Sequence, residues 1–253
     1  MPQWNHFLIA VTLAFVRISG IIVLAPLFSS NALPVRAKAV FALAIAYLLT
    51  PVVAAQSLGG AALTFAALIG ELAVGLIYGL TLALMNEMLL FAGQIAGLQF
   101  SFSLVNLLDP ASSIQTPLLG ELFQLMGTLV VLSAGLDRIL LASLVRSFHA
   151  VPLGSYVLAS TSAAVLVHAA GGIFLAAVQL AAPVLAATLL VEVAVAVMGR
   201  MSPQLPVISL TIPLKTLTGF SLLIGSLALW PHFIEARFDR LLDLAEKLIS
   251  MRG

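Results

Sequence analysis

Long apolar runs are the feature that most constrains the fold of this chain. They occupy approximately residues 7–28, 39–53, 61–108, 118–136, 160–198 and 207–230. In lipid every backbone N–H and C=O group must be hydrogen-bonded within the protein, so such runs form helices or closed barrels. Most of these runs have about 20 residues or more and lack the alternation of barrel strands. The sequence therefore predicts an all-α protein with several membrane-associated helices.

Two of the runs, 61–108 and 160–198, are longer than one membrane crossing requires. An apolar core of about 30 Å is crossed by roughly 20 helical residues. Each long run should therefore contain a bend, a hairpin or an extension beyond the membrane. The positions at which we expect a break or a kink are Gly93, Gly97, Gly171, Gly172 and Pro183. Proline inside a helix removes one backbone bond and bends the helix.

The low charge content supports a membrane protein and excludes several other classes. Hydrophobic residues make up 62% of the chain and charged residues 8%, against about 25% charged in a soluble domain. Lipid or the apolar surfaces of partner subunits must therefore cover much of the molecule. The net charge of +1 gives no electrostatic reason to expect a nucleic-acid partner. No cysteine, metal-binding histidine motif, nucleotide motif or hydrolase motif is present, so we expect no cofactor, no metal and no catalytic residue.

A few charged residues interrupt the apolar runs: Arg17, Glu71, Glu87, Glu121, Glu192 and Lys215. An unpaired charge in lipid costs roughly 2.5–3.5 kcal/mol or more, so these side chains should face a partner or water. A proton relay would need acids on neighbouring turns, but Glu71 and Glu87 lie about four turns apart. We therefore interpret five of the residues as pairing between helices or between subunits: Arg17, Glu71, Glu87, Glu192 and Lys215.

Residues 106–117 form a polar stretch with two prolines between strongly apolar regions. The residue before a proline is displaced from the helical conformation, so a helix should break near Pro110 and near Pro117. At membrane depth non-helical backbone is tolerated only inside protein or beside water. Two interpretations remain open: a segment that lines or blocks a channel, and an ordinary surface loop between two spans.

The chain divides by composition into a hydrophobic helical part, residues 1–230, and a charged tail, residues 231–253. Apolar residues of the tail recur at spacings of three and four, which predicts an amphipathic helix. Trp230 suits a membrane interface and Pro231 suits the first turn of this helix. The helix could lie on the membrane surface or bind a cytoplasmic partner, and the sequence leaves both open.

An ordered set of short motifs along the chain resembles the FliR family, the R-type subunits of the flagellar type III protein export gate. The motifs are Arg-Ile at 17–18, Ala-Pro at 25–26, Leu-Pro-Val-Arg at 33–36, Gly-Leu-Gln-Phe at 97–100, Leu-Asp-Pro at 108–110, Pro-Leu-Leu-Gly at 117–120, Ser-Phe-His-Ala-Val-Pro-Leu-Gly at 147–154, Ala-Pro-Val-Leu at 182–185, Arg-Met-Ser-Pro-Gln-Leu at 200–205 and Ile-Pro-Leu-Lys at 212–215. The resemblance covers nearly the whole chain.

The resemblance implies kinked helices that assemble with P-type and Q-type subunits into a helical hetero-oligomeric export gate. It also implies contacts with the B-type switch protein and the A-type export platform. The gate would lie in the bacterial inner membrane, within the flagellar basal body, in contact with lipid. Unfolded flagellar substrate proteins would pass through it, and the chain would be a non-enzymatic part of the pore.

The family's central loop plugs the closed pore, which gives residues 106–117 a role by analogy. The implied plug residues are Asn106, Leu107, Leu108, Asp109, Pro110, Ser112, Ser113, Gln115 and Pro117. The residues that lead into the plug are Gln99, Phe100 and Phe102.

Two alternatives to the flagellar gate remain. The first is the equivalent T-type subunit of a virulence injectisome. The second is a small-solute secondary transporter, which predicts inverted repeats and a polar site at the membrane midplane. No repeat is evident, and the embedded acids are dispersed.

Overall fold

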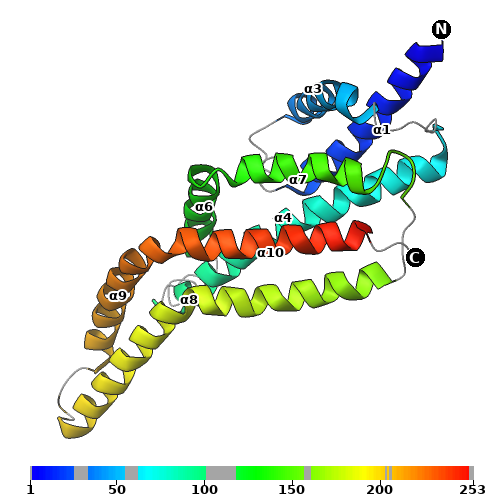
Figure 1. The fold of residues 1–253 in the computed structure, drawn as a ribbon. Helices are drawn as coiled ribbons and strands as arrows, with labels where there is room; N and C mark the ends of the chain where they lie inside the picture. Colours follow the sequence, from blue (N-terminus) through cyan, green and yellow to red (C-terminus); the bar gives the residue numbers. More distant parts are fainter. Residues whose placement is uncertain are drawn as a thin grey trace, which may run out of the picture. The chain divides into compact units, whose positions relative to one another are not determined.

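The computed structural model describes residues 2–25, 34–54, 62–100, 118–156, 161–202, 204 and 207–250. Helices follow one another along the chain (Figure 1) in the order α1 (Pro2–Leu24), α3 (Val35–Ala54), α4 (Phe65–Gln99), α6 (Leu118–Ser133), α7 (Leu136–Ala150), α8 (Thr161–Met201), α9 (Val207–Ser226), the 3-10 helix η1 (Leu227–Leu229) and α10 (Trp230–Ser250). The described residues contain no β-strand, which confirms the predicted all-α class. Five helical stretches among them are long and apolar enough to cross a membrane.

Helices α4 and α8 contain 35 and 41 residues. At a rise of 1.5 Å per residue these helices are about 52 and 62 Å long, well beyond an apolar core of about 30 Å. The break expected at Gly93 and Gly97 is wrong, because α4 continues through both residues and ends at Gln99. Helix α8 is likewise continuous through Gly171 and Gly172. Gly75 and Gly93 of α4 instead admit a close neighbour, as described below.

Three of the helices contain an internal proline: Pro51 in α3, Pro183 in α8 and Pro213 in α9. Each proline removes one backbone hydrogen bond from its helix. Such helices are stable only when packing or lipid contact supports them, because propensity alone disfavours proline in a helix interior by about 3 kcal/mol.

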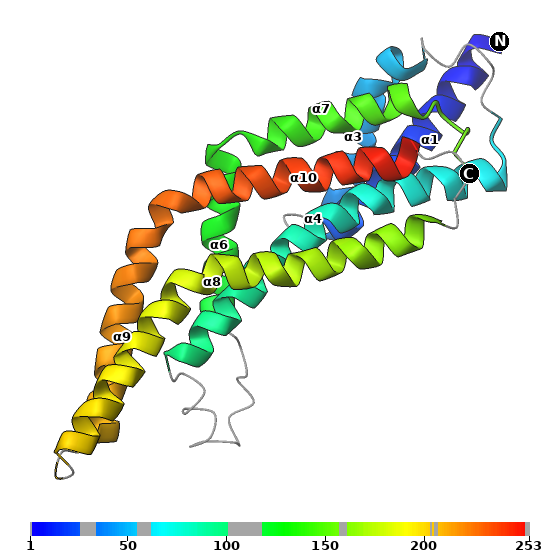
Figure 2. The same cartoon turned by 60° about the horizontal axis from the view of Figure 1, so that its bottom comes forward.

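The chain divides into two compact units, each of which is described by itself. The first consists of Met1–Met85, Gly135–Ala170 and Arg237–Gly253. Within it α1 contacts both α3 and α4 (Figure 2). A Cβ atom at Gly75 of α4 would lie 2.1 Å from the carbonyl oxygen of Arg17 in α1. The two backbones therefore approach at a distance that only glycine permits, and this contact places Arg17 against α4.

The second unit consists of Asn86–Ala134 and Gly171–Ala236. In this unit α6 packs against the C-terminal half of α4. A Cβ atom at Gly93 would lie 2.4 Å from the carbonyl oxygen of Leu119. Trp230 is buried against Phe123, with ring centroids 4.7 Å apart. Its ring therefore fills the interior of this unit, whereas the expected place of Trp230 at a membrane interface stays a prediction.

Helix α10 buries one face and exposes the other. The buried apolar residues are Ile234, Phe238, Leu242, Ala245, Leu248 and Ile249. The exposed charged residues are Glu235, Asp239, Arg240, Asp243 and Lys247. A helix lying on a membrane must turn its apolar face to lipid, and here that face is used inside the chain. The membrane-surface interpretation is therefore wrong, whereas the division of the chain at residue 231 stays a prediction.

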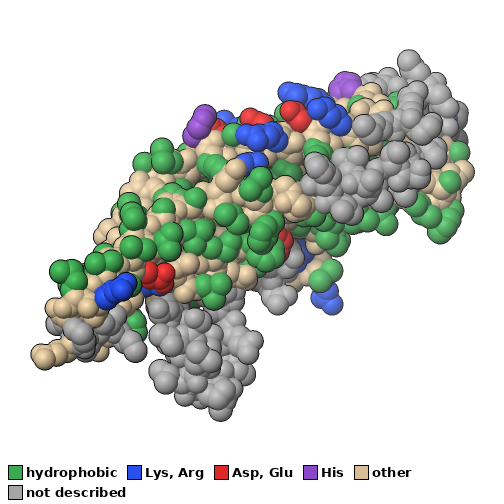
Figure 3. Space-filling model, turned by 90° about the horizontal axis from the view of Figure 1, so that it is seen from below, with side chains coloured by type: hydrophobic (Ala, Val, Ile, Leu, Met, Phe, Trp, Pro, Cys, Tyr) green, Lys and Arg blue, Asp and Glu red, His purple; other side chains and the backbone are tan. Residues whose placement is uncertain are grey.

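Large apolar side chains are exposed along several helices. Figure 3 shows hydrophobic side chains over much of the face that it draws. On α3 the most exposed of them include Val40, Leu48 and Tyr47, at 67%, 72% and 59%. Exposed apolar area of this extent is typical of a surface covered by lipid or by another protein.

Candidate functional site

Two ion pairs bring together four of the charged residues that interrupt the apolar runs. Arg17 of α1 pairs with Glu71 of α4, and Lys215 of α9 pairs with Glu192 of α8. Glu87 is exposed on α4 and belongs to neither of these pairs. In each pair the two partners come from different helices within one compact unit.

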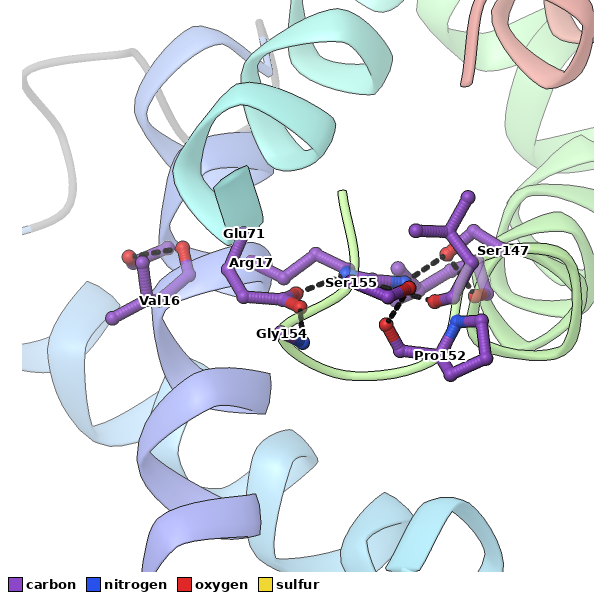
Figure 4. Close-up of polar contacts among 10 residues, drawn as sticks. Val16, Arg17, Glu71, Ser147, Pro152, Gly154 and Ser155 are labelled. Atoms are coloured by element: carbon purple, nitrogen blue, oxygen red, sulfur yellow. Dashed lines mark hydrogen bonds and ion pairs between the residues drawn. The ribbon is translucent and has the colours of Figure 1, made fainter. Parts of the chain in front are cut away.

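The Arg17 side chain is completely buried, and its three nitrogens donate to three different acceptors (Figure 4). Nε donates to Oε2 of Glu71 over 2.5 Å. Nη1 donates to Oγ of Ser147 over 3.2 Å, and Nη2 donates to the carbonyl oxygen of Val151 over 3.1 Å. The guanidinium carbon also lies 4.2 Å from the ring centroid of Phe148. Arg17 thereby joins α1 to α4 and to the C-terminal end of α7.

The Glu71 carboxylate is also fully buried and uses both oxygens. Its second oxygen, Oε1, accepts the backbone N–H of Gly154 over 2.8 Å. Gly154 has φ of +77°, a left-handed conformation that glycine adopts without steric cost. The Ser147 hydroxyl in turn donates to the carbonyl oxygen of Leu144 over 2.6 Å. Each charged group therefore meets several polar atoms.

The hydrogen-bond partners of Arg17 and Glu71 determine whether the buried ion pair stabilises the fold. Removing two charges from water is costly, and the cost is offset only when geometry is good and the remaining polar atoms are satisfied. The contacts to Ser147, Val151 and Gly154 meet that condition. All three belong to the motif at residues 147–154, so that segment completes the environment of an ion pair formed by α1 and α4. The cluster therefore connects α1, α4 and the segment at residues 147–154 within one compact unit.

Sequence reasoning missed a second polar contact on α7, at Ser143. This buried serine donates to Oε1 of Glu246 in α10 over 3.0 Å. The hydroxyl of Tyr78 in α4 donates to the backbone carbonyl of Ser143 over 3.4 Å. Ser143 and Ser147 are four residues apart, so they lie on one face of α7. Two serines at this spacing in a helix are the signal that could have located the face.

The second pair, between Lys215 and Glu192, lies in the other unit. The Lys215 side chain is 9% exposed, whereas that of Glu192 is 46% exposed. Nζ of Lys215 donates to Oε1 of Glu192. The pair connects α8 to α9, the two helices on either side of the motif at residues 200–205. Since one partner is half-exposed, this pair is screened more strongly than the Arg17 pair.

The N-terminal approach to the predicted plug is held by α8 and α9. Phe100 directly follows α4 and is 2% exposed. Its ring stacks on Phe220 of α9, with centroids 4.8 Å apart and planes at 17°. The preceding residue, Gln99, accepts a hydrogen bond at Oε1 from the hydroxyl of Thr188 over 3.3 Å. A Cβ atom at Gly219 would lie 1.8 Å from Cε1 of Phe100, so the ring occupies space that only glycine leaves free.

The C-terminal end of the same stretch returns to α4. Leu119, at the start of α6, is buried, and its backbone contacts Gly93 of α4. A Cβ atom at Gly97 would lie 3.8 Å from Cβ of Leu119. Gly97 is three residues before Phe100, so the chain leaves α4 and enters α6 at neighbouring points.

The predicted plug residues themselves lie outside the described residues. They are Asn106, Leu107, Leu108, Asp109, Pro110, Ser112, Ser113, Gln115 and Pro117. Phe102, predicted to lead into the plug, also lies outside the described residues. Among the residues that the structure describes, no group of three or more His, Cys, Asp or Glu side chains could hold a metal ion.

Comparison with known proteins identifies the family. The sequence matches the bacterial export proteins, family 1, over residues 8–241. Flagellar biosynthetic protein FliR of Escherichia coli (strain K12) is 29% identical, covering 98% of this chain and 95% of the relative. The protein of the same name from Aquifex aeolicus (strain VF5) is 29% identical, covering 97% and 96%. That of Bacillus subtilis (strain 168) is 27% identical, covering 96% of each. Since the match runs through nearly all of the helices described above, this chain belongs to the bacterial export proteins, family 1.

Proposed function

We propose that this chain is a subunit of the flagellar type III protein export gate. The observation that carries the proposal is the similarity to flagellar biosynthetic proteins along 90% or more of both partners in each comparison given above. The relatives named there are flagellar rather than injectisome proteins, which favours the flagellar gate over the T-type alternative. The role is non-enzymatic: the chain forms part of the route along which unfolded flagellar proteins leave the cell.

The exposed apolar surface supports a place within a larger assembly in the inner membrane, at the flagellar basal body. Helix α3 exposes Val40, Leu43 and Leu48, and α8 exposes Leu190 and Val193. P-type and Q-type gate subunits cover part of this surface and lipid covers the rest. The B-type switch protein and the A-type export platform complete the set of proposed partners.

Residues 106–117 act as the plug of the resting pore, with Gln99 and Phe100 as its approach. Two features support this role. The stretch is polar and contains two prolines, so it has little tendency to continue α4 as a helix. The described residues on both sides of it, Phe100 and Leu119, are buried, so packed side chains flank the proposed plug at both ends.

Co-purification with genetic complementation tests the gate assignment. The tagged chain is expressed in a motile bacterium from which its own R-type subunit has been deleted, and membranes are extracted with mild detergent. We expect recovery of one particle with P-type and Q-type subunits, together with restored export of a hook protein. A chain recovered alone, in cells that export normally without it, contradicts the proposal. Restored secretion by a needle system but not by a flagellar one supports the injectisome alternative.

A deletion tests the plug. Removing residues 112–115 from the full chain is expected to raise the leak of small ions through the inner membrane, while the gate still assembles. The leak is measured as collapse of an imposed ion gradient in vesicles that contain the purified particle. An assembled gate without those four residues that holds the gradient as well as the wild type refutes the sealing role.

A further inference from the structure

The described residues that flank positions 101–117 pack against glycines whose missing side chains make room for a neighbour. At the first end Phe100 fits against Gly219 of α9, and at the second the Leu119 backbone fits against Gly93 of α4. These contacts are closer than a Cβ atom allows, at 1.8 Å and 2.4 Å from the position where that atom would stand. Side chains in packed interiors interdigitate with few voids, so the fit at each glycine is sensitive to a single added methyl group.

The contacts at Phe100 come from two helices. Gly219 and Phe220 of α9 surround its ring, and Thr188 of α8 donates a hydrogen bond to the preceding Gln99. Thr188 is itself fully buried, and the single hydrogen of its hydroxyl is shared with the carbonyl oxygen of Val184, which lies 2.9 Å from Oγ1. The C-terminal end of α4 is thus fixed by the packing of the Phe100 ring against Gly219 and by the hydrogen bond between Thr188 and Gln99. Both contacts lie within one compact unit.

We propose that Gly219 is a positioning residue for the pore seal. By admitting the Phe100 ring, it fixes the last described residue before the proposed plug, at the C-terminal end of α4. The inference rests on the plug role proposed above and extends it to α9, a helix that contributes no residue to the plug. Gly219 acts through Phe100 rather than by contact with an exported protein.

The substitution Gly219→Ala adds a methyl group in the space that the Phe100 ring occupies. The atoms of its ring that meet the new methyl group are Cε1, Cδ1 and Cζ. A ring displaced from Gly219 also changes its stacking on Phe220. A leucine at position 100 keeps a δ carbon near Cδ1 but has no atoms where Cε1 and Cζ stand, so Phe100→Leu should relieve the closest contact in a Gly219→Ala background.

The first measurement is the thermal midpoint of the assembled particle, analysed as a double-mutant cycle. Gly219→Ala and Phe100→Leu should be non-additive, because residues in contact couple whereas distant ones do not. Gly225→Ala is the matched control: it lies on the same helix, and a Cβ atom there meets nothing within 4 Å. Its effect should add to that of Phe100→Leu. Additive midpoints for Gly219→Ala and Phe100→Leu overturn the proposed fit.

The second measurement is the ion leak of the same particles in vesicles. We expect Gly219→Ala to leak toward the level of the 112–115 deletion, Gly225→Ala to stay at the wild-type level, and the Gly219→Ala, Phe100→Leu pair to leak less than Gly219→Ala alone. If the 112–115 deletion raises the ion leak and Gly219→Ala does not, the positioning role is refuted and the plug role stands. If the particle without residues 112–115 leaks no more than the wild type, the plug role is refuted, and the proposed role of Gly219 is refuted with it.

Discussion

Replacing Arg17 with alanine removes the centre of the buried cluster at the end of α7. The substitution leaves the Glu71 carboxylate at 0% exposure, with the Gly154 N–H as its remaining described partner. Removing one member of a buried ion pair costs about 3–5 kcal/mol, because the other charge stays buried without its partner. Domains of this size lose about 2–4 °C of thermal midpoint per kcal/mol. We therefore expect the midpoint of the Arg17→Ala particle to fall by roughly 6–20 °C.

The assay is thermal unfolding of the detergent-purified export particle, followed by intrinsic fluorescence. Arg146→Ala is the matched control, because it removes an arginine from the exposed face of α7. Surface substitutions of this kind usually change stability by no more than about 0.5 kcal/mol. Glu71→Ala should cost about as much as Arg17→Ala, since it leaves the opposite charge buried alone.

The double variant, Arg17→Ala with Glu71→Ala, separates the ion pair from simple loss of packing. Once one charge has been removed, removing the other no longer leaves an unpaired charge. The double variant should therefore be more stable than the sum of the single effects predicts, by on the order of 0.5–3 kcal/mol. A wild-type midpoint for Arg17→Ala, or strict additivity of the two substitutions, would show that the pair does not contribute as the structure implies.

Three further predictions follow from single contacts. Gly75→Ala should destabilise the particle by about 1–3 kcal/mol, because the added methyl group forces the α1 and α4 backbones apart; Gly171→Ala, which meets nothing within 4 Å, should instead be neutral or raise the thermal midpoint. Ser143→Ala should cost about 1 kcal/mol through loss of its hydrogen bond to α10, and a midpoint no lower than that of the exposed Ser250→Ala variant contradicts this. Lys215→Met should lower the midpoint less than Arg17→Ala does, because its acidic partner is 46% exposed and water can solvate it; an equal or larger loss refutes this ranking.

Much of the helical architecture could be predicted from the sequence, because its signal is local. The apolar run at residues 7–28 corresponds to α1, and the run at 207–230 corresponds to α9 with η1. In an apolar environment the backbone has to satisfy its own hydrogen bonds, so long apolar runs leave few choices. The glycines of α4 were misread because glycine has two uses: it breaks helices, and it also lets a second backbone approach closely.

The candidate site was only partly accessible from the sequence. The charged residues in apolar runs stand out one by one, so Arg17 and Glu71 were found as candidates for pairing. Ser143 was not found, because a single serine in a helix is common, and its signal lies only in its spacing of four residues from Ser147. The role of Gly219 is equally invisible, since its meaning depends on a ring that is far away along the chain.

The sequence by itself determined the class of the protein, its helices and the residues whose charge demands a partner, because hydrophobicity and charge act at each position separately. The tertiary structure decided which partners meet. It joined Arg17 to Glu71 and to the motif at residues 147–154, and it placed the Phe100 ring against Gly219. Contacts of this kind depend on how helices from distant parts of the chain pack, and no local property of the sequence fixes that arrangement.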